Sequence, residues 1–89
     1  MKIKKDFVLR RVLGTLMVMP LGEQSHKLSG MMTLTESGAI LWEKLEQGCD
    51  MDTLTRALTD EYDVTEARAR ADAEKFVEKL TQLGCLDTD

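Results

Sequence analysis

The segment LTESGAILWEKLEQG, residues 34–48, marks the point where the chain changes from strand-forming to helix-forming sequence. Thr35 is a favourable N-cap, because its hydroxyl can accept a hydrogen bond from the first turn of a helix. Apolar residues then recur at helical spacing until Gly48 ends the pattern, at Ala39, Ile40, Leu41, Trp42 and Leu45. The segment therefore predicts a helix that begins after Thr35 and ends at Gly48.

The residues before this segment favour β-structure. Residues 7–13 and 16–19 are rich in β-forming side chains and predict two strands, with a turn at residues 14–15. Residues 20–27 are polar and contain Pro20 and Gly22, which predicts a loop, and residues 28–34 can supply a third strand. Three antiparallel strands in series leave at least one edge of the sheet unpaired.

Two further helices are predicted after Gly48. Asp50 or Asp52 caps the first of them, which ends near residues 62–63 and carries Met51, Leu54, Ala57 and Leu58 on one face. Thr65 caps the last and longest helix, and Gly84 ends it. The apolar stripe of this helix consists of Ala69, Ala73, Phe76, Val77, Leu80 and Leu83. Residues 85–86 can then return to the core.

This order of elements is typical of an α+β fold, because no crossover alternates strands with helices as a parallel sheet requires. We expect one domain over residues 1–89, with a three-stranded antiparallel sheet followed by three helices that lie on one face of the sheet. The helix order also resembles a winged helix-turn-helix in which the hairpin is a displaced wing.

The charge of the chain argues against nucleic acid as a partner. Formal net charge is −4, and although residues 1–11 are basic, the chain is strongly acidic from Glu36 onward. Phosphate neutralisation by Lys and Arg supplies most non-specific nucleic-acid affinity, and an acidic domain lacks that surface. From net charge alone we expect a basic partner rather than DNA.

The sequence predicts a protein that is kept in the cytoplasm. Residues 12–19 are apolar but fall far short of the ~20 residues of a membrane span, and no small-residue cleavage site follows them. Cys49 and Cys85 lack C-x-x-C spacing and His26 is the only histidine, so neither a zinc site nor a disulfide framework is expected. We therefore expect two free thiols in a reducing compartment, with no metal and no cofactor.

The candidates for catalysis are weak, and we expect no enzyme activity. Cys49 stands just before a predicted helix, where the helix N-terminus could lower its pKa, but His26 in a different loop is a poor base for it. No glycine-rich phosphate loop is present. Met17, Met19, Met31 and Met32 are compatible with core packing and also with an adaptable peptide-binding surface.

Three segments resemble the PqqD-like family, named for the coenzyme PQQ synthesis protein D. They are LTESGAILWEKL at residues 34–45, LTDEYDV at residues 58–64, and DAEKFVEKL at residues 72–80 followed by LGCL at residues 83–86. The resemblance covers nearly the whole chain. Thr35 departs from it, because the family often has Asn at this position.

The resemblance implies the module called a RiPP recognition element, which binds the leader segment of a ribosomally made precursor peptide. Such a module presents the leader to a modifying enzyme, commonly a radical S-adenosylmethionine (SAM) protein. In relatives the leader adds as a strand beside the third strand and packs against the third helix. Carried over to this sequence, the pairing edge comprises Gly30, Met31, Met32, Thr33 and Leu34, and the helical wall comprises Arg68, Asp72, Lys75, Phe76 and Lys79.

Two alternative functions stay open from the sequence. One is a winged-helix DNA-binding regulator, favoured by the helix order and opposed by the acidity. The other is a non-catalytic subunit that binds only its enzyme partner. The oligomeric state is equally open between a monomer and a weak dimer, because an unpaired strand edge can pair between copies.

Overall fold

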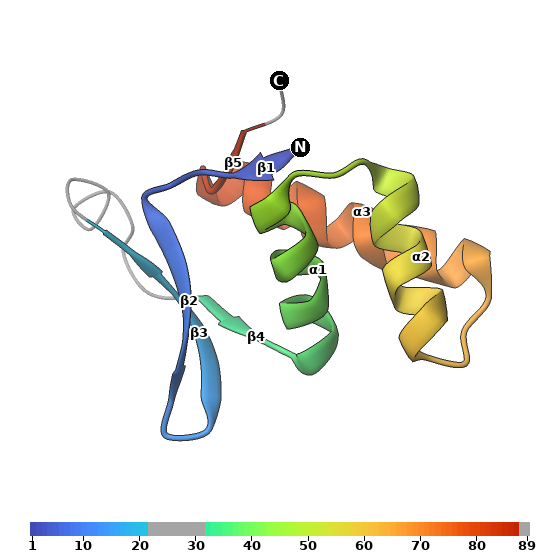
Figure 1. Ribbon diagram of the computed structural model, residues 1–89, viewed down its shortest axis with the longest axis horizontal. Helices are drawn as coiled ribbons and strands as arrows, with labels where there is room; N and C mark the ends of the chain where they lie inside the picture. Colours follow the sequence, from blue (N-terminus) through green and yellow to red (C-terminus); the bar gives the residue numbers. More distant parts are fainter. Residues whose placement is uncertain (22–31, 88–89) are drawn as a thin grey trace.

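A computed structural model describes residues 1–21 and 32–87 of the chain. Within these ranges the elements are, in chain order, β1 (Lys2–Ile3), β2 (Phe7–Val12), β3 (Thr15–Pro20), β4 (Met32–Leu34), α1 (Glu36–Gln47), α2 (Met51–Glu61), α3 (Glu66–Leu83) and β5 (Leu86–Asp87). The helices lie together on one side of the β2–β3–β4 sheet, as predicted (Figure 1). The α+β fold class is therefore confirmed.

Strands β2, β3 and β4 form an antiparallel sheet in that order within the described part of the chain. Phe7 pairs with Pro20 at the open end of the β2–β3 hairpin, and Leu34 pairs with Leu16 between β3 and β4. The three predicted strands are thus present, with ends that differ by about one residue in the hairpin, as boundaries commonly do. For the third strand, residues 28–31 lie outside the described residues.

The hairpin turn lies one residue earlier than the prediction at residues 14–15. Leu13 and Gly14 occupy the turn with φ angles of 52° and 82°, while Thr15 already pairs with Val12. A two-residue turn with positive φ at both central residues matches the twist of the flanking strands. Thr15 is β-branched and strongly disfavours positive φ, so it belongs to the strand rather than to the turn.

A second, two-stranded sheet joins the two ends of the described chain and was not predicted. β1 pairs antiparallel with β5, with Ile3 opposite Leu86, and the Lys4 N–H donates to the Cys85 carbonyl at 2.9 Å. Cys85 and Leu86 are buried, which confirms their predicted return to the core. Strands of two residues carry no detectable periodicity, so only packing reveals this sheet.

Each described helix begins at a predicted cap. The cap side chains accept hydrogen bonds from backbone N–H groups: Thr35 from Gly38 at 3.1 Å, Asp50 from Thr53 at 2.8 Å, and Thr65 from Arg68 at 3.1 Å. Of the two candidates for α2, Asp50 is therefore the cap. Gly48 and Gly84 end α1 and α3 with φ angles of 87° and 75°, which glycine adopts without strain.

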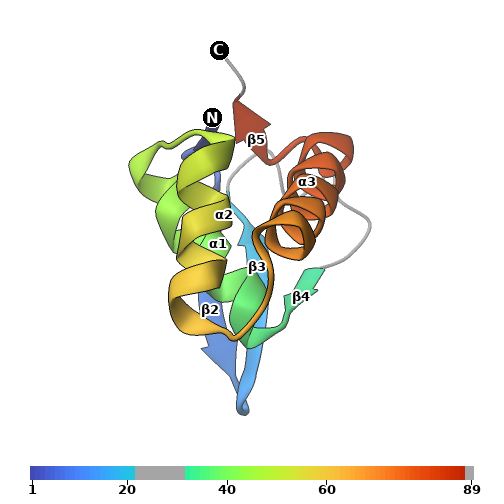
Figure 2. The same cartoon turned by 90° about the vertical axis from the view of Figure 1, so that its right-hand side faces the viewer.

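The core lies between the sheet and the helices, with α1 packed against α2 and α2 against α3 (Figure 2). Its largest fully buried side chains are Trp42, Leu45, Leu54, Leu80, Val18 and Cys85. They come from β3, each of the helices and the segment after α3, so the core forms only when all these elements are assembled. In the described residues, no helix is long and apolar enough to cross a membrane.

Candidate functional site

The outer edge of β4 has no strand partner among the described residues. β4 pairs with β3 along one side only, with Met32 opposite Val18 and Thr33 opposite Met17. Met32 and Leu34 are half-buried and pack against the core, while Thr33 is exposed, as alternation along a strand requires. An edge of this kind leaves backbone N–H and C=O groups available to an added strand.

An open cavity of ≈ 600 Å³ lies next to this edge, between the helices. It is bounded by the N-terminal end of α1, the C-terminal end of α2 with the turn after it, and one face of α3. Its lining residues are Thr35, Glu36, Ser37, Gly38, Leu41, Leu58, Tyr62, Val64, Asp72, Lys75, Phe76 and Lys79. We call this cavity the groove.

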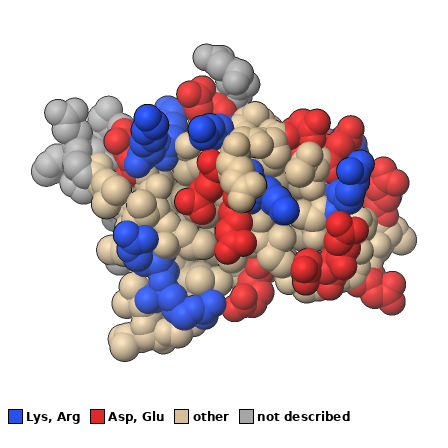
Figure 3. Space-filling view, viewed as in Figure 1, with Lys and Arg blue, Asp and Glu red and all other residues tan. Residues whose placement is uncertain are grey.

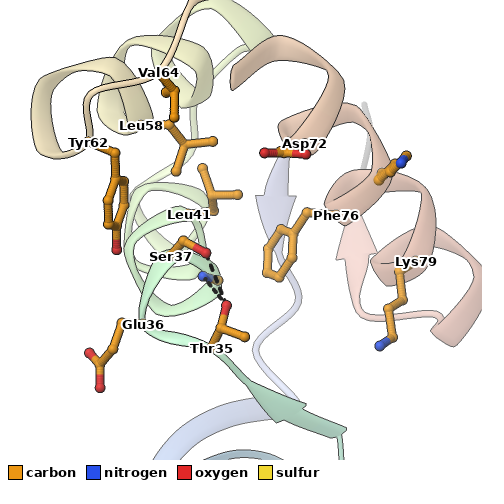
Figure 4. Close-up of a pocket in the computed structure, with 12 residues that line it drawn as sticks. Thr35, Glu36, Ser37, Leu41, Leu58, Tyr62, Val64, Asp72, Phe76 and Lys79 are labelled. Carbon is orange, nitrogen blue, oxygen red and sulfur yellow. Dashed lines mark hydrogen bonds between the residues drawn. The ribbon is translucent and has the colours of Figure 1, made fainter. Parts of the chain in front are cut away.

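The middle of the groove is apolar. Figure 4 shows Leu41, Leu58 and Val64 facing Phe76 across it, with Tyr62 at one side. Tyr62 and Val64 each keep 39% of their surface exposed, although both are large hydrophobic residues. An accessible apolar surface with convergent polar groups at its rim is typical of a ligand-binding cleft.

The groove continues to the β4 edge. A smaller cavity of ≈ 150 Å³ is lined by Met32, Thr33 and Leu34 of β4 on one side and by Phe76 and Lys79 of α3 on the other. Thr35, Gly38, Phe76 and Lys79 line both cavities. A chain that pairs with β4 would therefore lie directly beside the apolar groove.

Gly38 sets the depth of the groove where the two cavities meet. A Cβ atom at this buried position would lie 3.4 Å from Cε1 of Phe76 and 3.5 Å from Cβ of Leu34. The Thr35 hydroxyl, which caps α1, lies at the same point and also contacts the Ser37 hydroxyl at 3.0 Å (Figure 4). Because glycine has no Cβ, the Phe76 ring and the Leu34 side chain come close to the α1 backbone at this point.

The acidic residues of the groove are ion-paired from outside it. Asp72 lies 3.4 Å from the Arg68 guanidinium, one turn earlier on α3. Glu36 lies 3.8 Å from the guanidinium of Arg11 in the hairpin. These pairs are exposed, so each contributes little to stability, but each offsets a negative charge at the groove.

The structure brings most of the predicted site residues together. Met32, Thr33, Leu34, Asp72, Lys75, Phe76 and Lys79 line the groove or its extension along β4. Arg68 lines neither, and its contact to the site within the described residues runs through Asp72, while Gly30 and Met31 lie outside the described residues. The roles of all the predicted site residues in peptide binding stay predictions.

The sequence-based prediction missed the other side of the groove, which α1, α2 and the following turn supply. Leu41 and Leu58 belong to apolar stripes that also build the core. Their helical spacing therefore does not distinguish a residue that packs in the core from one that lines the groove. Gly38 was a detectable signal, because a glycine inside a helical pattern often has a packing reason. Tyr62 and Val64 were detectable as apolar residues in a short connection.

The thiol sites do not resemble an activated nucleophile. Burial raises the pKa of the Cys49 thiol, which is opposite to the lowering that a helix N-terminus could produce. Burial also raises the pKa of the Cys85 thiol. Both cysteines are free, and His26 lies outside the described residues.

The fold and the groove together define a class of protein: a small winged-helix-like α+β module with an unpaired edge strand beside an apolar cleft. Residues 15–86 match the family described as Coenzyme PQQ synthesis protein D (PqqD). The chain belongs to this family.

Two solved structures share the fold. One, described as TbiB1 in complex with the TbiA(beta) leader peptide, has a TM-score of 0.79 and 21% identity, and the alignment covers 100% of this chain and 98% of the other. The second is a lasso peptide synthetase B1 complexed with the leader peptide. It has a TM-score of 0.76 and 17% identity, with 94% and 93% of the two chains covered. No curated protein matches the sequence significantly.

Proposed function

We propose that this chain is a peptide-binding adaptor, which takes an extended leader segment of a precursor peptide along β4 and presents it to a separate modifying enzyme. The observation that carries the proposal is the continuity between the unpaired β4 edge and the apolar groove. Strand addition supplies affinity through backbone hydrogen bonds, and adjacent pockets supply specificity through side chains.

The comparisons support this proposal through the fold. Both similar structures are complexes with a leader peptide, and each aligns with nearly the whole of this chain. Family membership supports the same role. We infer that the chain acts by binding and not by catalysis, and that a radical SAM protein is the modifying enzyme. The two free thiols fit a reducing cytoplasm.

The available contacts predict modest affinity. About five backbone hydrogen bonds at roughly 1 kcal/mol each and about three apolar anchors at roughly 2 kcal/mol each supply ~11 kcal/mol. Association removes at least ~4 kcal/mol of this. The remaining ~7 kcal/mol corresponds to a Kd of about 1–10 μM, which suits an adaptor that releases its peptide to an enzyme.

The direct test is an NMR titration of ¹⁵N-labelled protein with a synthetic leader from a short reading frame encoded beside this chain. We expect chemical-shift changes concentrated at Met32–Leu34 and along residues 72–79 of α3. The proposal would be contradicted if saturating leader leaves the spectrum of the folded protein unchanged. It would also be contradicted if only the signals of residues remote from the groove shift.

Thr33→Pro tests the docking edge, because proline cannot donate a hydrogen bond from its backbone nitrogen. The Leu21 N–H donates to the Asp6 carbonyl, so by alternation along β3 the backbone groups of Leu16 and Val18 face β4. Their partners Leu34 and Met32 therefore face β3, and the Thr33 N–H between them faces the outer edge. We expect Thr33→Pro to lose leader binding, while Thr33→Val keeps the backbone donor and a β-branched side chain and binds normally. Circular dichroism checks the fold of both variants. A folded Thr33→Pro variant that binds as well as the wild type would exclude β4 as the docking strand.

Phe76→Ala tests the α3 wall. Phe76 lines both cavities and also packs against the core, so Phe76→Leu serves as the matched variant that retains apolar volume. We expect Phe76→Ala to weaken leader binding by at least about tenfold, in line with the loss of an apolar anchor worth roughly 2 kcal/mol. Unchanged affinity in a folded Phe76→Ala protein would remove Phe76 from the site.

A further inference from the structure

Within the described part of the chain, the groove carries positive charge that no carboxylate pairs, although the chain as a whole is acidic. Four charged residues line it: Glu36, Asp72, Lys75 and Lys79. The two carboxylates have arginine partners outside the groove. Within residues 1–21 and 32–87, neither lysine lies within ion-pairing distance of a carboxylate.

The two lysines share one face of α3 with the apolar wall. Residues 72, 75, 76 and 79 follow the spacing of a single helical stripe, and all four line the groove. Lys79 also lines the extension beside β4, and in Figure 4 its side chain extends from α3 towards the segment that contains Thr35. Lys79 therefore stands at the path of a peptide paired with β4, and Lys75 lies one turn earlier on the same wall of the groove.

The spacing of the lysines matches an extended chain. Four residues of α-helix rise about 6 Å, and side chains two residues apart on a strand are separated by about 6.6 Å. Such side chains point to the same face of the strand. Two acidic residues separated by one other residue can thus face Lys75 and Lys79 together.

We propose that the groove selects a peptide segment that carries two carboxylates two residues apart, next to an apolar side chain that enters the cleft. This inference rests on the proposed function and names the chemistry of the peptide. It also replaces the expectation of a basic partner drawn from net charge, because the local charge at the groove is opposite to that of the whole chain.

The test is a selection of short random peptides displayed on phage against the full-length protein, with a charge-reversed variant in parallel. The variant is Lys75→Glu/Lys79→Glu. The matched control is Lys4→Glu/Lys5→Glu, which makes the same change in net charge at two exposed lysines outside the groove. Thr33→Pro, which removes the N–H at the outer edge of β4, identifies the peptides whose binding depends on β4, and circular dichroism confirms that each variant is folded.

We expect wild-type protein and the control to enrich apolar peptides with Asp or Glu at positions i and i+2, and the groove variant to lose or reverse this preference. A synthetic peptide of the enriched sequence should bind the groove variant about tenfold more weakly. The difference should shrink between ionic strengths of about 0.01 M and about 1 M, as the Debye length falls from about 30 Å to about 3 Å.

The outcomes separate this inference from the proposed function. The inference would be overturned if peptides bind through β4 but show no preference for acidic residues. It would also be overturned if that preference persists in the Lys75→Glu/Lys79→Glu variant. In both cases the adaptor function would still stand. Failure to enrich any peptide that depends on β4 would overturn both. A loss of acidic preference in the control as well would trace the effect to net charge, which also overturns the assignment to Lys75 and Lys79.

Discussion

Leu13 is the least favourably placed side chain of the hairpin. It is fully exposed and holds a φ of 52°, a conformation that costs a branched residue about 1–2 kcal/mol relative to glycine. Gly14 follows it with a φ of 82°. A turn with positive φ at both central residues favours the sequence Asn-Gly. Gly14 fits this preference, but Leu13 occupies the position where asparagine is preferred.

Leu13→Asn should therefore stabilise the protein by about 1 kcal/mol, because asparagine tolerates positive φ and is solvated at an exposed turn. Urea denaturation followed by the fluorescence of Trp42, the one tryptophan in the sequence, measures the change. Leu13→Ala is the control that removes exposed apolar surface but keeps the strained backbone. Equal stabilisation by both variants would show that strain at Leu13 is unimportant.

Gly38 controls access to the groove. A Cβ at this position meets Phe76 at an ordinary contact distance of 3.4 Å, so alanine is accommodated, whereas the two further methyl groups of valine must displace the ring or Leu34. We expect Gly38→Val to weaken leader binding by about tenfold, because overpacking costs about 1–3 kcal/mol. Calorimetric titration with the leader peptide is the measurement.

Gly38→Ala is the matched control for this variant and should bind the leader with nearly wild-type affinity. If Gly38→Val binds equally well while remaining folded, then the peptide does not pass the point where the groove meets the β4 edge.

The helices of this protein are specified by their ends. Thr35, Asp50 and Thr65 each cap a helix through a contact to the backbone three residues later. Such contacts are local, which is why the sequence predicted all these helix starts. β1 and β5 are the opposite case, since each is too short to be recognised and exists only because the other end of the described chain lies beside it.

The cap of α2 makes part of the stability depend on pH. Hydrogen bonds from Thr53 lower the pKa of the Asp50 carboxyl below its ordinary value of 3.8. A carboxyl with a lowered pKa in the folded state contributes stability above the unfolded pKa and loses it as pH falls through the folded pKa. The contribution of Asp50 therefore disappears in the acid range below about pH 4.

Asp50→Asn should keep the cap, because asparagine caps helices about as well, but should remove this pH dependence. Stability measured by urea denaturation between neutral and acid pH should fall less steeply in the variant than in the wild type. Asp60→Asn is the control, since Asp60 is an exposed acid near the other end of α2. Parallel curves for wild type and Asp50→Asn would contradict the assigned role of the cap.

The two ends of the molecule differ in charge. Figure 3 shows lysine and arginine gathered over the β2–β3 hairpin, and aspartate and glutamate over the helices. The groove lies among the acidic helices, but its two lysines have no carboxylate partner in the residues that the structure describes. The whole-chain charge is therefore a poor guide to the partner. Two alternatives stay open. One is a DNA-binding regulator, which the helix order favours, and the other is a non-catalytic subunit that contacts only its enzyme partner.

Peptide binding should stabilise the whole fold, because the groove includes side chains from α1, α2 and α3 together with the β4 edge. Leader peptide at about 100 times its Kd should add about 2.7 kcal/mol of stability, which corresponds to a rise in Tm of about 10 °C or more for a domain of this size. A thermal melt with increasing peptide measures it. An unchanged Tm at saturating peptide would contradict binding to the folded state.

Caps, apolar periodicity and turn residues were sufficient to predict the helices, the hairpin, the third strand and the α+β class, because each signal depends on residues a few positions apart. The resemblance then pointed to β4 and α3 as the site. The opposite side of the groove could not be predicted in this way. Leu41, Leu58 and Phe76 come from three different helices. Their apolar stripes are equally consistent with packing in the core and with lining a groove.

Packing between distant segments decided the remaining features: which edge of the sheet stays unpaired, how β1 meets β5, and which lysines keep no carboxylate partner among the described residues. The physical reason is that local hydrogen bonds and periodicity specify an element. The volumes and charges that meet across assembled elements specify the shape and electrostatics of the groove between them.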